Sequence, residues 1–167
     1  MRNKIIFIMI LGLALTYVGC TSGRTIVMNV PSERAKVNTL DIVEDQSTVS
    51  VPAEVTNLFR EKLEAALFVG EQGSTPPFVK GKDFVIRYRF IQFNAGSQFK
   101  RWLGGGIGGY GEGSMTVEAR FINSSGKEIS KIQSEGNIGA GIFGGSMDGA
   151  VKKCVEEVVQ YAKQNFR

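Results

Sequence analysis

The chain has 167 residues, of which 43% are hydrophobic and 22% charged, a balance typical of one globular domain with its own core. Twenty Lys and Arg side chains stand against sixteen Asp and Glu, and without Arg2 and Lys4 of the N-terminal segment the numbers are eighteen and sixteen, so no nucleic-acid partner is expected. Histidine is absent, which excludes serine–histidine hydrolase triads and zinc sites built from histidine.

The first twenty residues, MRNKIIFIMILGLALTYVGC, have the arrangement of a secretory signal. Two cations precede an apolar run from Ile5 to Leu15, and small residues come before Cys20. The run is too short for a membrane-spanning helix, which needs about 20 residues. No later segment is longer and equally apolar, so we expect no transmembrane helix.

The four residues at 17–20, YVGC, resemble the lipobox of bacterial lipoproteins, although Tyr17 stands where Leu is usual. The resemblance implies a signal peptide over 1–19 and lipid attachment at Cys20, which becomes the first mature residue. Three acyl chains then hold the protein on the membrane with its polypeptide outside the bilayer. Thr21 in the second mature position, rather than Asp, implies the outer membrane, with the protein facing the periplasm.

The mature chain opens on a segment, 20–35, that mixes small, polar and apolar residues and contains Pro31. We expect a tether there, with at most one edge strand, followed by a single domain over 36–167. Within that domain the segment 36–43 is a plausible strand, and the polar run at 44–50 indicates a loop.

The first helix is predicted to begin at Ser50, an N-cap residue, with Pro52 in its first turn and Gly70 at its end. Its apolar residues recur at helical spacing: Val55, Leu58, Phe59, Leu63, Ala66 and Leu67. The segment 70–82 contains glycines and prolines that indicate a loop.

Alternation of apolar and polar side chains predicts a strand over 83–94. The segments 115–122 and 127–134 alternate in the same way on either side of the turn NSSG at 123–126, and together they predict a hairpin.

The last segment, 147–166, is predicted to be an amphipathic helix, and Cys154 lies on its apolar stripe. There a free thiol behaves as a small hydrophobic side chain; the alternative is a disulfide with Cys20. Together the elements predict an α+β two-layer sandwich, in which two amphipathic helices cover a mostly antiparallel sheet of about four strands.

Gly139, Gly141 and Gly144 spell G-x-G-x-x-G between a predicted strand and the last helix. A dinucleotide site also requires a second parallel strand after that helix, and the sequence has none, so we expect no nucleotide and no other cofactor. A second match at 106–111 lacks the companion motifs of kinases. The glycines are best explained by backbone geometry at loops and at a helix entry.

Gly141, Gly145 and Gly149 also stand four residues apart, as in packed membrane helices, but polar residues interrupt this segment. A pore-type oligomer is therefore the alternative hypothesis. The stretch FKRW at 99–102 joins Phe99 and Trp102 to Lys100 and Arg101, a combination that suits a lipid interface or a protein partner. The competing interpretation packs Trp102 over the edge of the sheet.

The chain from about residue 36 onward resembles a family of bacterial envelope lipoproteins whose domain has no assigned function. The resemblance rests on FKRWLGGGIGG, SMTVEARFI, NSSGKEI and GAGIFGGSMDGA. It brings no catalytic residues, and more distantly the layout is similar to small periplasmic adaptor domains. We therefore expect a lipid-anchored, non-catalytic binding or scaffolding module with an envelope protein as partner, and no metal site. An enzyme that works without histidine is the third possibility, but no acidic pair at suitable spacing supports it.

Overall fold

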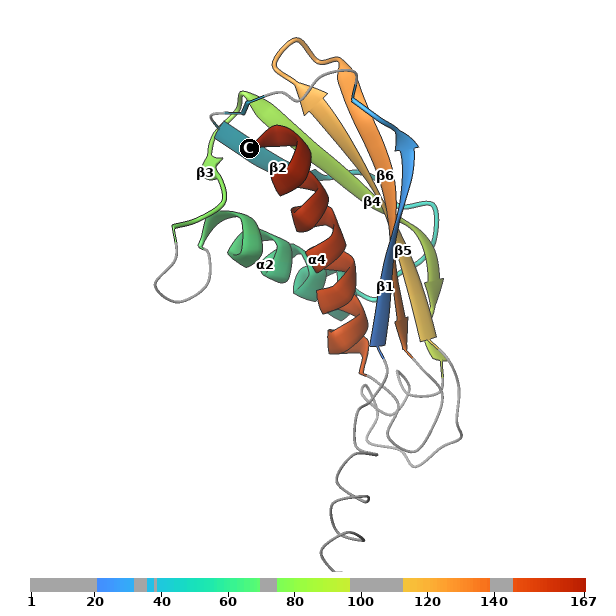
Figure 1. Ribbon diagram of the computed structural model, residues 1–167. Coiled ribbons are helices and arrows are strands. Elements are labelled where there is room, and N and C mark those ends of the chain that lie inside the picture. The colour runs from blue at the N-terminus through green and yellow to red at the C-terminus, as the bar shows by residue number, and fades with distance from the viewer. Residues whose placement is uncertain (1–20, 32–35, 38, 70–74, 97–112, 139–145) are drawn as a thin grey trace, which may run out of the picture.

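The computed structural model describes residues 21–31, 36–37, 39–69, 75–96, 113–138 and 146–167. Within them the chain forms six strands and two long helices (Figure 1). In chain order these elements are β1 (Thr21–Asn29), β2 (Thr39–Glu44), α2 (Ala53–Phe68), β3 (Val79–Lys80), β4 (Phe84–Asn94), β5 (Gly113–Asn123), β6 (Glu128–Ile138) and α4 (Met147–Phe166).

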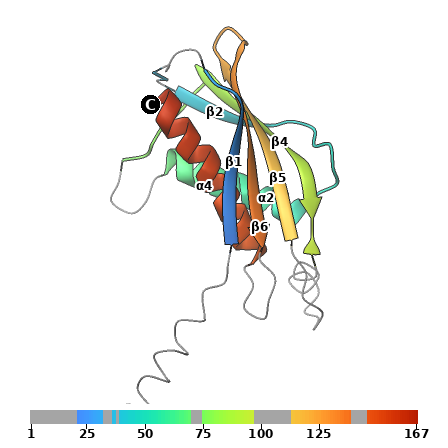
Figure 2. The same ribbon diagram turned by 45° about the vertical axis from the view of Figure 1, so that its right-hand side comes forward.

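The strands form one sheet in the order β1-β6-β5-β4-β2-β3, and both helices lie against the same face of it (Figures 1 and 2). The α+β two-layer class is confirmed, but the expectation of about four strands is wrong, because the sheet has six. The two additional strands, β1 and β3, are its edges. They carry no clear apolar alternation and are held mainly by backbone pairing, which a periodicity argument does not detect.

The sheet combines two kinds of connection. Strands β4, β5, β6 and β1 are antiparallel neighbours, and the turn at 123–126 joins β5 to β6 as predicted. Strands β2 and β4 are parallel. Parallel neighbours need a long crossover, and α2 supplies it.

The core lies between the sheet and the helices. The alternate residues Phe84, Ile86, Tyr88 and Phe90 of β4 are all buried and face the helical layer. Phe59 of α2 contacts two of them, with ring centroids 5.0 Å from Tyr88 and 5.4 Å from Phe90. At the other end of the core Phe166 of α4 lies 4.8 Å from Phe84. The aromatic alternation in the sequence therefore marks the buried face of the central strand.

The two helices begin differently. The hydroxyl of Ser146 accepts a hydrogen bond from the backbone N–H of Gly149 at 3.0 Å and caps α4. The first helix begins later than predicted, because Pro52 occupies the N-cap position of α2 and no side chain caps it. The prediction of Ser50 as the cap is therefore wrong: a proline pre-set in φ begins this helix instead.

Strand β1 lies inside the segment expected to be a tether. It pairs antiparallel with β6 from Thr21 onward, so the edge-strand alternative is what this segment contains. Arg24 forms an ion pair with Glu135 of β6 at 2.9 Å, and the hydroxyl of Thr25 donates to Glu157 of α4. The strand is thus bound to both layers of the sandwich.

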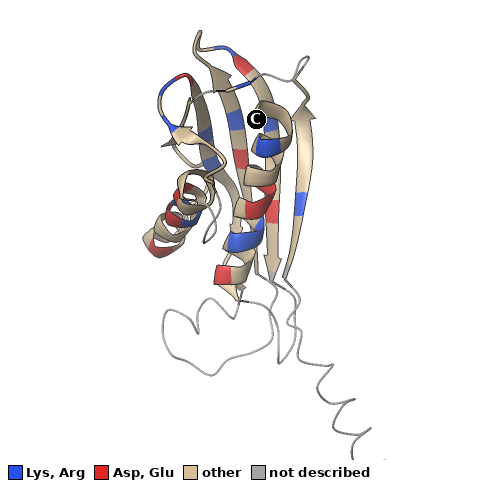
Figure 3. Cartoon of the chain, turned by 60° about the vertical axis from the view of Figure 1, so that its left-hand side comes forward, with Lys and Arg blue, Asp and Glu red and all other residues tan. Residues whose placement is uncertain are grey.

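Acidic and basic side chains are interspersed over the helices and strands (Figure 3). Along α4, for example, Lys153 pairs with Glu156 at 2.7 Å.

Candidate functional site

The candidate site residues that the sequence predicted for lipid attachment and partner contact are not among those that the structure describes. Cys20, and with it Phe99, Lys100, Arg101 and Trp102, lie outside the described ranges, as do the glycines of both G-x-G-x-x-G matches. The structure does, however, place the residues that flank these segments.

Four of those flanking positions meet at one end of the sheet, which we call the Thr21 end. Thr21, the first residue of β1, pairs with Ile138, the last residue of β6. Ile138 pairs in turn with Gly113, the first residue of β5, and Asn94 at the end of β4 pairs with the adjacent Ser114. Four strand ends therefore lie together. At this end β1 begins after Cys20, β4 ends before residues 97–112, β5 begins after them, and β6 ends before residue 139.

Cys154 is a free, fully buried thiol in the middle of α4. Its Sγ donates to the carbonyl of Ser134 at 3.2 Å, and the hydroxyl of Ser134 donates to the carbonyl of Cys154 at 2.8 Å. Burial raises the pKa of Cys154 to about 12. The thiol stays protonated at neutral pH, so Cys154 is a packing residue and not a nucleophile.

Helix α4 lies very close to β6 at Gly136. A Cβ atom built on Gly136 would lie 2.2 Å from the carbonyl oxygen of Ala150. Only a glycine fits between the strand and the first turn of the helix.

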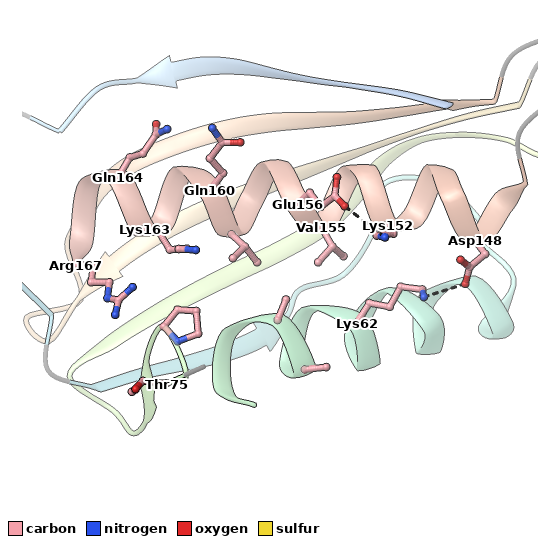
Figure 4. A pocket seen from close by; sticks show the side chains of 14 residues that line it. Lys62, Thr75, Asp148, Lys152, Val155, Glu156, Gln160, Lys163, Gln164 and Arg167 are labelled. Atoms are coloured by element: carbon pink, nitrogen blue, oxygen red, sulfur yellow. Dashed lines mark ion pairs between the residues drawn. The ribbon is translucent and has the colours of Figure 1, made fainter. Parts of the chain in front are cut away.

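One hollow of the described surface is an open groove between α2 and α4, with a volume of about 1310 Å³. Figure 4 shows α4 along one side and α2 along the other. Its floor consists of small and apolar side chains from both helices and the segment before β3: Ala65, Ala66, Pro77, Val155 and Val159. We call it the interhelical groove.

Charged side chains border the interhelical groove. At one end Lys62 of α2 and Asp148 of α4 form an ion pair at 3.0 Å, drawn as a dashed line in Figure 4. Toward the other end lie Lys163 and Arg167, for which the described part of the chain provides no ion-pair partner. Counting also Lys152 and Glu156, the lining holds four basic and two acidic residues, a local excess of two positive charges.

Two further properties bear on function. Among the described residues no cluster of three or more His, Cys, Asp or Glu side chains is arranged to hold a metal ion. The same part of the chain contains no helix with the length and apolar character needed to cross a membrane.

The sequence reasoning did not identify the interhelical groove. The last helix was predicted to be amphipathic, and the structure buries its apolar residues, Val155 and Val159 among them. A groove, however, depends on the angle at which the two helices pack, and the spacing of residues within one helix contains no information about that angle.

Comparison with known proteins places this α+β sandwich. Residues 29–141 match a domain of unknown function, DUF4410, and the chain belongs to that family. No curated protein matches the chain significantly.

Solved structures share the fold at low sequence identity. PelC from Paraburkholderia phytofirmans, a dodecamer, superposes with a TM-score of 0.50 at 10% identity, covering 89% of this chain and 99% of PelC. Protein XCC0632 from Xanthomonas campestris, of family DUF330, gives 0.49 at 10% identity, covering 84% and 93%. A "putative lipoprotein" from Caulobacter crescentus gives 0.42 at 14% identity, covering 75% and 88%. At such identities the likeness concerns the fold alone.

Proposed function

We propose that this chain is a lipid-anchored, non-catalytic binding or scaffolding module of the bacterial envelope, attached to the outer membrane through acyl chains on Cys20 and facing the periplasm. The signal-like segment 1–19 and the lipobox-like residues at 17–20 are the sequence basis. Thr21 in the second mature position is the basis for the outer membrane.

The observation that carries the proposal is that β1 begins at Thr21, the residue after Cys20. The acyl chains would be attached to the first residue before an edge strand that is paired with β6 and bonded to α4. Such an anchor holds the Thr21 end of the sheet next to the membrane, because no flexible spacer separates it from the lipid.

The same geometry supports a contact of Phe99, Lys100, Arg101 and Trp102 with the membrane or with a partner beside it. The segment that contains them departs after Asn94 and returns at Gly113, both at the Thr21 end. Aromatic and cationic side chains are enriched where proteins meet lipid headgroups. Replacing Trp102 by Ala should therefore weaken this contact with little change in the melting temperature.

Lipid attachment is tested by growing cells with radioactive palmitate. We expect label in the purified full-length protein and none in the variant Cys20→Ala, which should also move from the membrane fraction to the soluble fraction. The matched control is Cys154→Ala, because it removes the other cysteine and should keep both label and membrane. An unlabelled wild-type protein, or a Cys20→Ala variant that still sediments with membranes, would contradict the proposal.

A second candidate is a subunit of a membrane-associated oligomer, and the position of β1 at the edge of the described sheet favours it. The strand has Arg24 as its only charged residue, contains no Pro or Lys, and exposes Val27 and Met28. Natural edge strands usually carry several charged residues, especially Lys, or a Pro, which prevent pairing with other chains. PelC, which has a similar fold, is a dodecamer.

The anchor restricts what such an oligomer could be. Two β1 strands paired antiparallel would place their Cys20 ends about 30 Å apart on opposite sides of the pair, since nine residues extend about 3.4 Å each. Chains anchored in one leaflet must instead use two different edges, which gives a head-to-tail ring. Mass photometry of detergent-solubilised protein tests this. The mass of a closed oligomer would support the second candidate, whereas monomers would contradict it and remain consistent with the first.

A further inference from the structure

We propose that the interhelical groove is a docking site for an acidic amphipathic helix of another envelope protein. The inference deepens the proposed function by assigning the binding surface of the module and the chemistry of its partner. It rests on that function only in treating the chain as a binding module, and its test does not involve the lipid.

The shape of the groove favours a polypeptide over a small molecule. Its volume of about 1310 Å³ exceeds the roughly 300–1000 Å³ typical of sites for drug-sized ligands. It is open along its length, between helices of 16 and 20 residues that extend about 24 and 30 Å. A site of these dimensions accommodates several turns of a helix lying along α4.

The floor favours an occupant with an apolar face. Ala65 and Ala66 lie side by side in the last turns of α2, and their small side chains let another backbone approach closely. The lining residues Val155 and Val159 of α4 are themselves only 3% and 8% exposed, so the apolar surface open to a partner comes mainly from Ala65, Ala66 and Pro77. A helix that presents apolar residues at spacings of three and four would bury them against this floor, the mode of recognition known as helix-in-groove.

The border favours an acidic occupant. Lys163 and Arg167 lie on the side of α4 that faces the groove (Figure 4) and have no acidic partner within the described part of the chain. Lys152 lies 3.9 Å from Glu156, but Lys153 approaches the same carboxylate to 2.7 Å. Carboxylates on a partner helix would supply the missing counter-charges and determine its orientation.

The groove also lies where a partner can reach it. Helix α4 begins at the Thr21 end, where Gly136 of β6 contacts Ala150. The helix ends about 30 Å away, so Lys163 and Arg167 are far from the anchored end. A protein in the periplasm could therefore enter the groove without contacting the bilayer.

The test measures binding of a fluorescent 18-residue helical peptide with Leu on one face and Glu on the other. The full-length protein is kept in detergent solution, protein-free detergent is measured in parallel, and fluorescence anisotropy reports binding. Two further probes separate the contributions: the same peptide with Gln in place of Glu, and polyglutamate, which has charge but no apolar face.

Two variants and two matched controls locate the site. Lys163→Glu removes a positive charge from the border, and Lys127→Glu makes the same change in the exposed turn between β5 and β6. Ala65→Trp fills the groove, and Glu61→Trp adds the same ring at an exposed position of α2 that does not line it. Circular dichroism confirms that each variant is folded.

We expect Lys163→Glu and Ala65→Trp each to weaken binding of the acidic peptide at least tenfold, with both controls within twofold of wild type. The Gln peptide and polyglutamate should each bind at least tenfold more weakly than the acidic peptide. No binding at 1 mM peptide, equal binding of polyglutamate, or equal losses in the controls would overturn the proposal. Palmitate label at Cys20 is a separate measurement, so failure here leaves the anchored module intact, and the reverse also holds.

Discussion

Gly136 illustrates how a single residue sets the distance between the two layers. The change Gly136→Ala would place a Cβ atom 2.2 Å from the carbonyl oxygen of Ala150, a backbone atom that cannot rotate away. We expect it to lower the free energy of unfolding by about 3 kcal/mol or more, because a layer of the sandwich must shift. Chemical denaturation followed by circular dichroism measures the loss.

The matched control is Gly23→Ala. Its Cβ would meet the Cβ of Lys153 at 3.2 Å, near the edge of the sheet, where the neighbouring side chains are more exposed and can move slightly. We expect a loss below about 1 kcal/mol. Equal losses in the two variants would show that the contact between Gly136 and Ala150 does not limit the packing.

The burial of the Cys154 thiol predicts how the free energy of unfolding changes at alkaline pH. Burial raises its folded-state pKa to about 12, above the value of about 8.5 for an exposed thiol, so the unfolded chain releases its proton first. The stability contributed by the protonated thiol is complete below about pH 8.5 and is lost as the pH rises toward 12. The free energy of unfolding should fall by up to about 1.4 kcal/mol per pH unit in this window.

Denaturant titrations at pH 8, 9 and 10 test this, with Cys154→Ala as the comparison. The variant is less stable at every pH, but the additional slope above pH 9 should be smaller, since it lacks the titrating thiol. Identical slopes in both proteins would contradict the assignment. Iodoacetamide should alkylate Cys154 at pH 8 only after denaturant is added.

At the scale of the element, the two helices predict different responses to loss of a serine. Ser146 accepts the N–H of Gly149, so Ser146→Ala should lower the free energy of unfolding by about 1 kcal/mol. Ser50 lies two residues before the N-cap position of α2, which Pro52 occupies. Ser50→Ala should therefore change stability by less than about 0.5 kcal/mol.

Thermal and denaturant unfolding of the two alanine variants provides the comparison, and the identical substitution makes each the control of the other. A larger loss for Ser50→Ala than for Ser146→Ala would mean that the sequence pattern, and not the observed cap, identifies the start of the first helix.

The elements that the sequence predicted well are those with strong periodicity. Met147–Phe166 is present as the predicted amphipathic helix and Phe84–Asn94 as the predicted strand, because long runs of apolar residues at spacing 3.6 or 2 indicate one type of element. Strand β1 was expected only as an optional edge strand, and β3 lies in the segment expected to be a loop. A two-residue strand and a strand that contains Gly23 depend on the backbones of their neighbours.

At the scale of the whole molecule, the position of β1 predicts how closely the domain sits on the membrane. Trp102 is the only tryptophan and provides a fluorescent reporter. Inserting twelve Gly and Ser residues between Cys20 and Thr21 adds a spacer with a mean length of about 20 Å. If the short connection holds the Thr21 end at the bilayer, brominated lipids should quench Trp102 at most half as much as in wild type.

The control inserts the same twelve residues between Ser125 and Gly126, in the turn of the β5–β6 hairpin, and should leave quenching unchanged. Unchanged quenching with the spacer at Cys20 would contradict a membrane contact maintained by the anchor. Both insertions should keep the circular dichroism spectrum of the wild type.

The candidate sites also divide into those that the sequence could identify and one that it could not. Cys20 and the stretch 99–102 were selected from the sequence because their chemistry is local: a cysteine after a short apolar run, and aromatic residues beside cations. The interhelical groove was not, because Lys62, Lys163 and Ala65 come from two helices and become one surface only when these pack.

By itself the sequence determined the α+β class, the alternation of the central strand, the apolar stripe of the last helix and the absence of histidine chemistry, since composition and periodicity are properties of one segment at a time. Only the tertiary structure decided that the sheet has six strands, that β1 begins beside Cys20, and that two helices diverge to form a groove. These depend on pairing and packing between segments distant in the chain, where backbone hydrogen bonds and interhelical angles, which leave no periodic pattern, determine the arrangement.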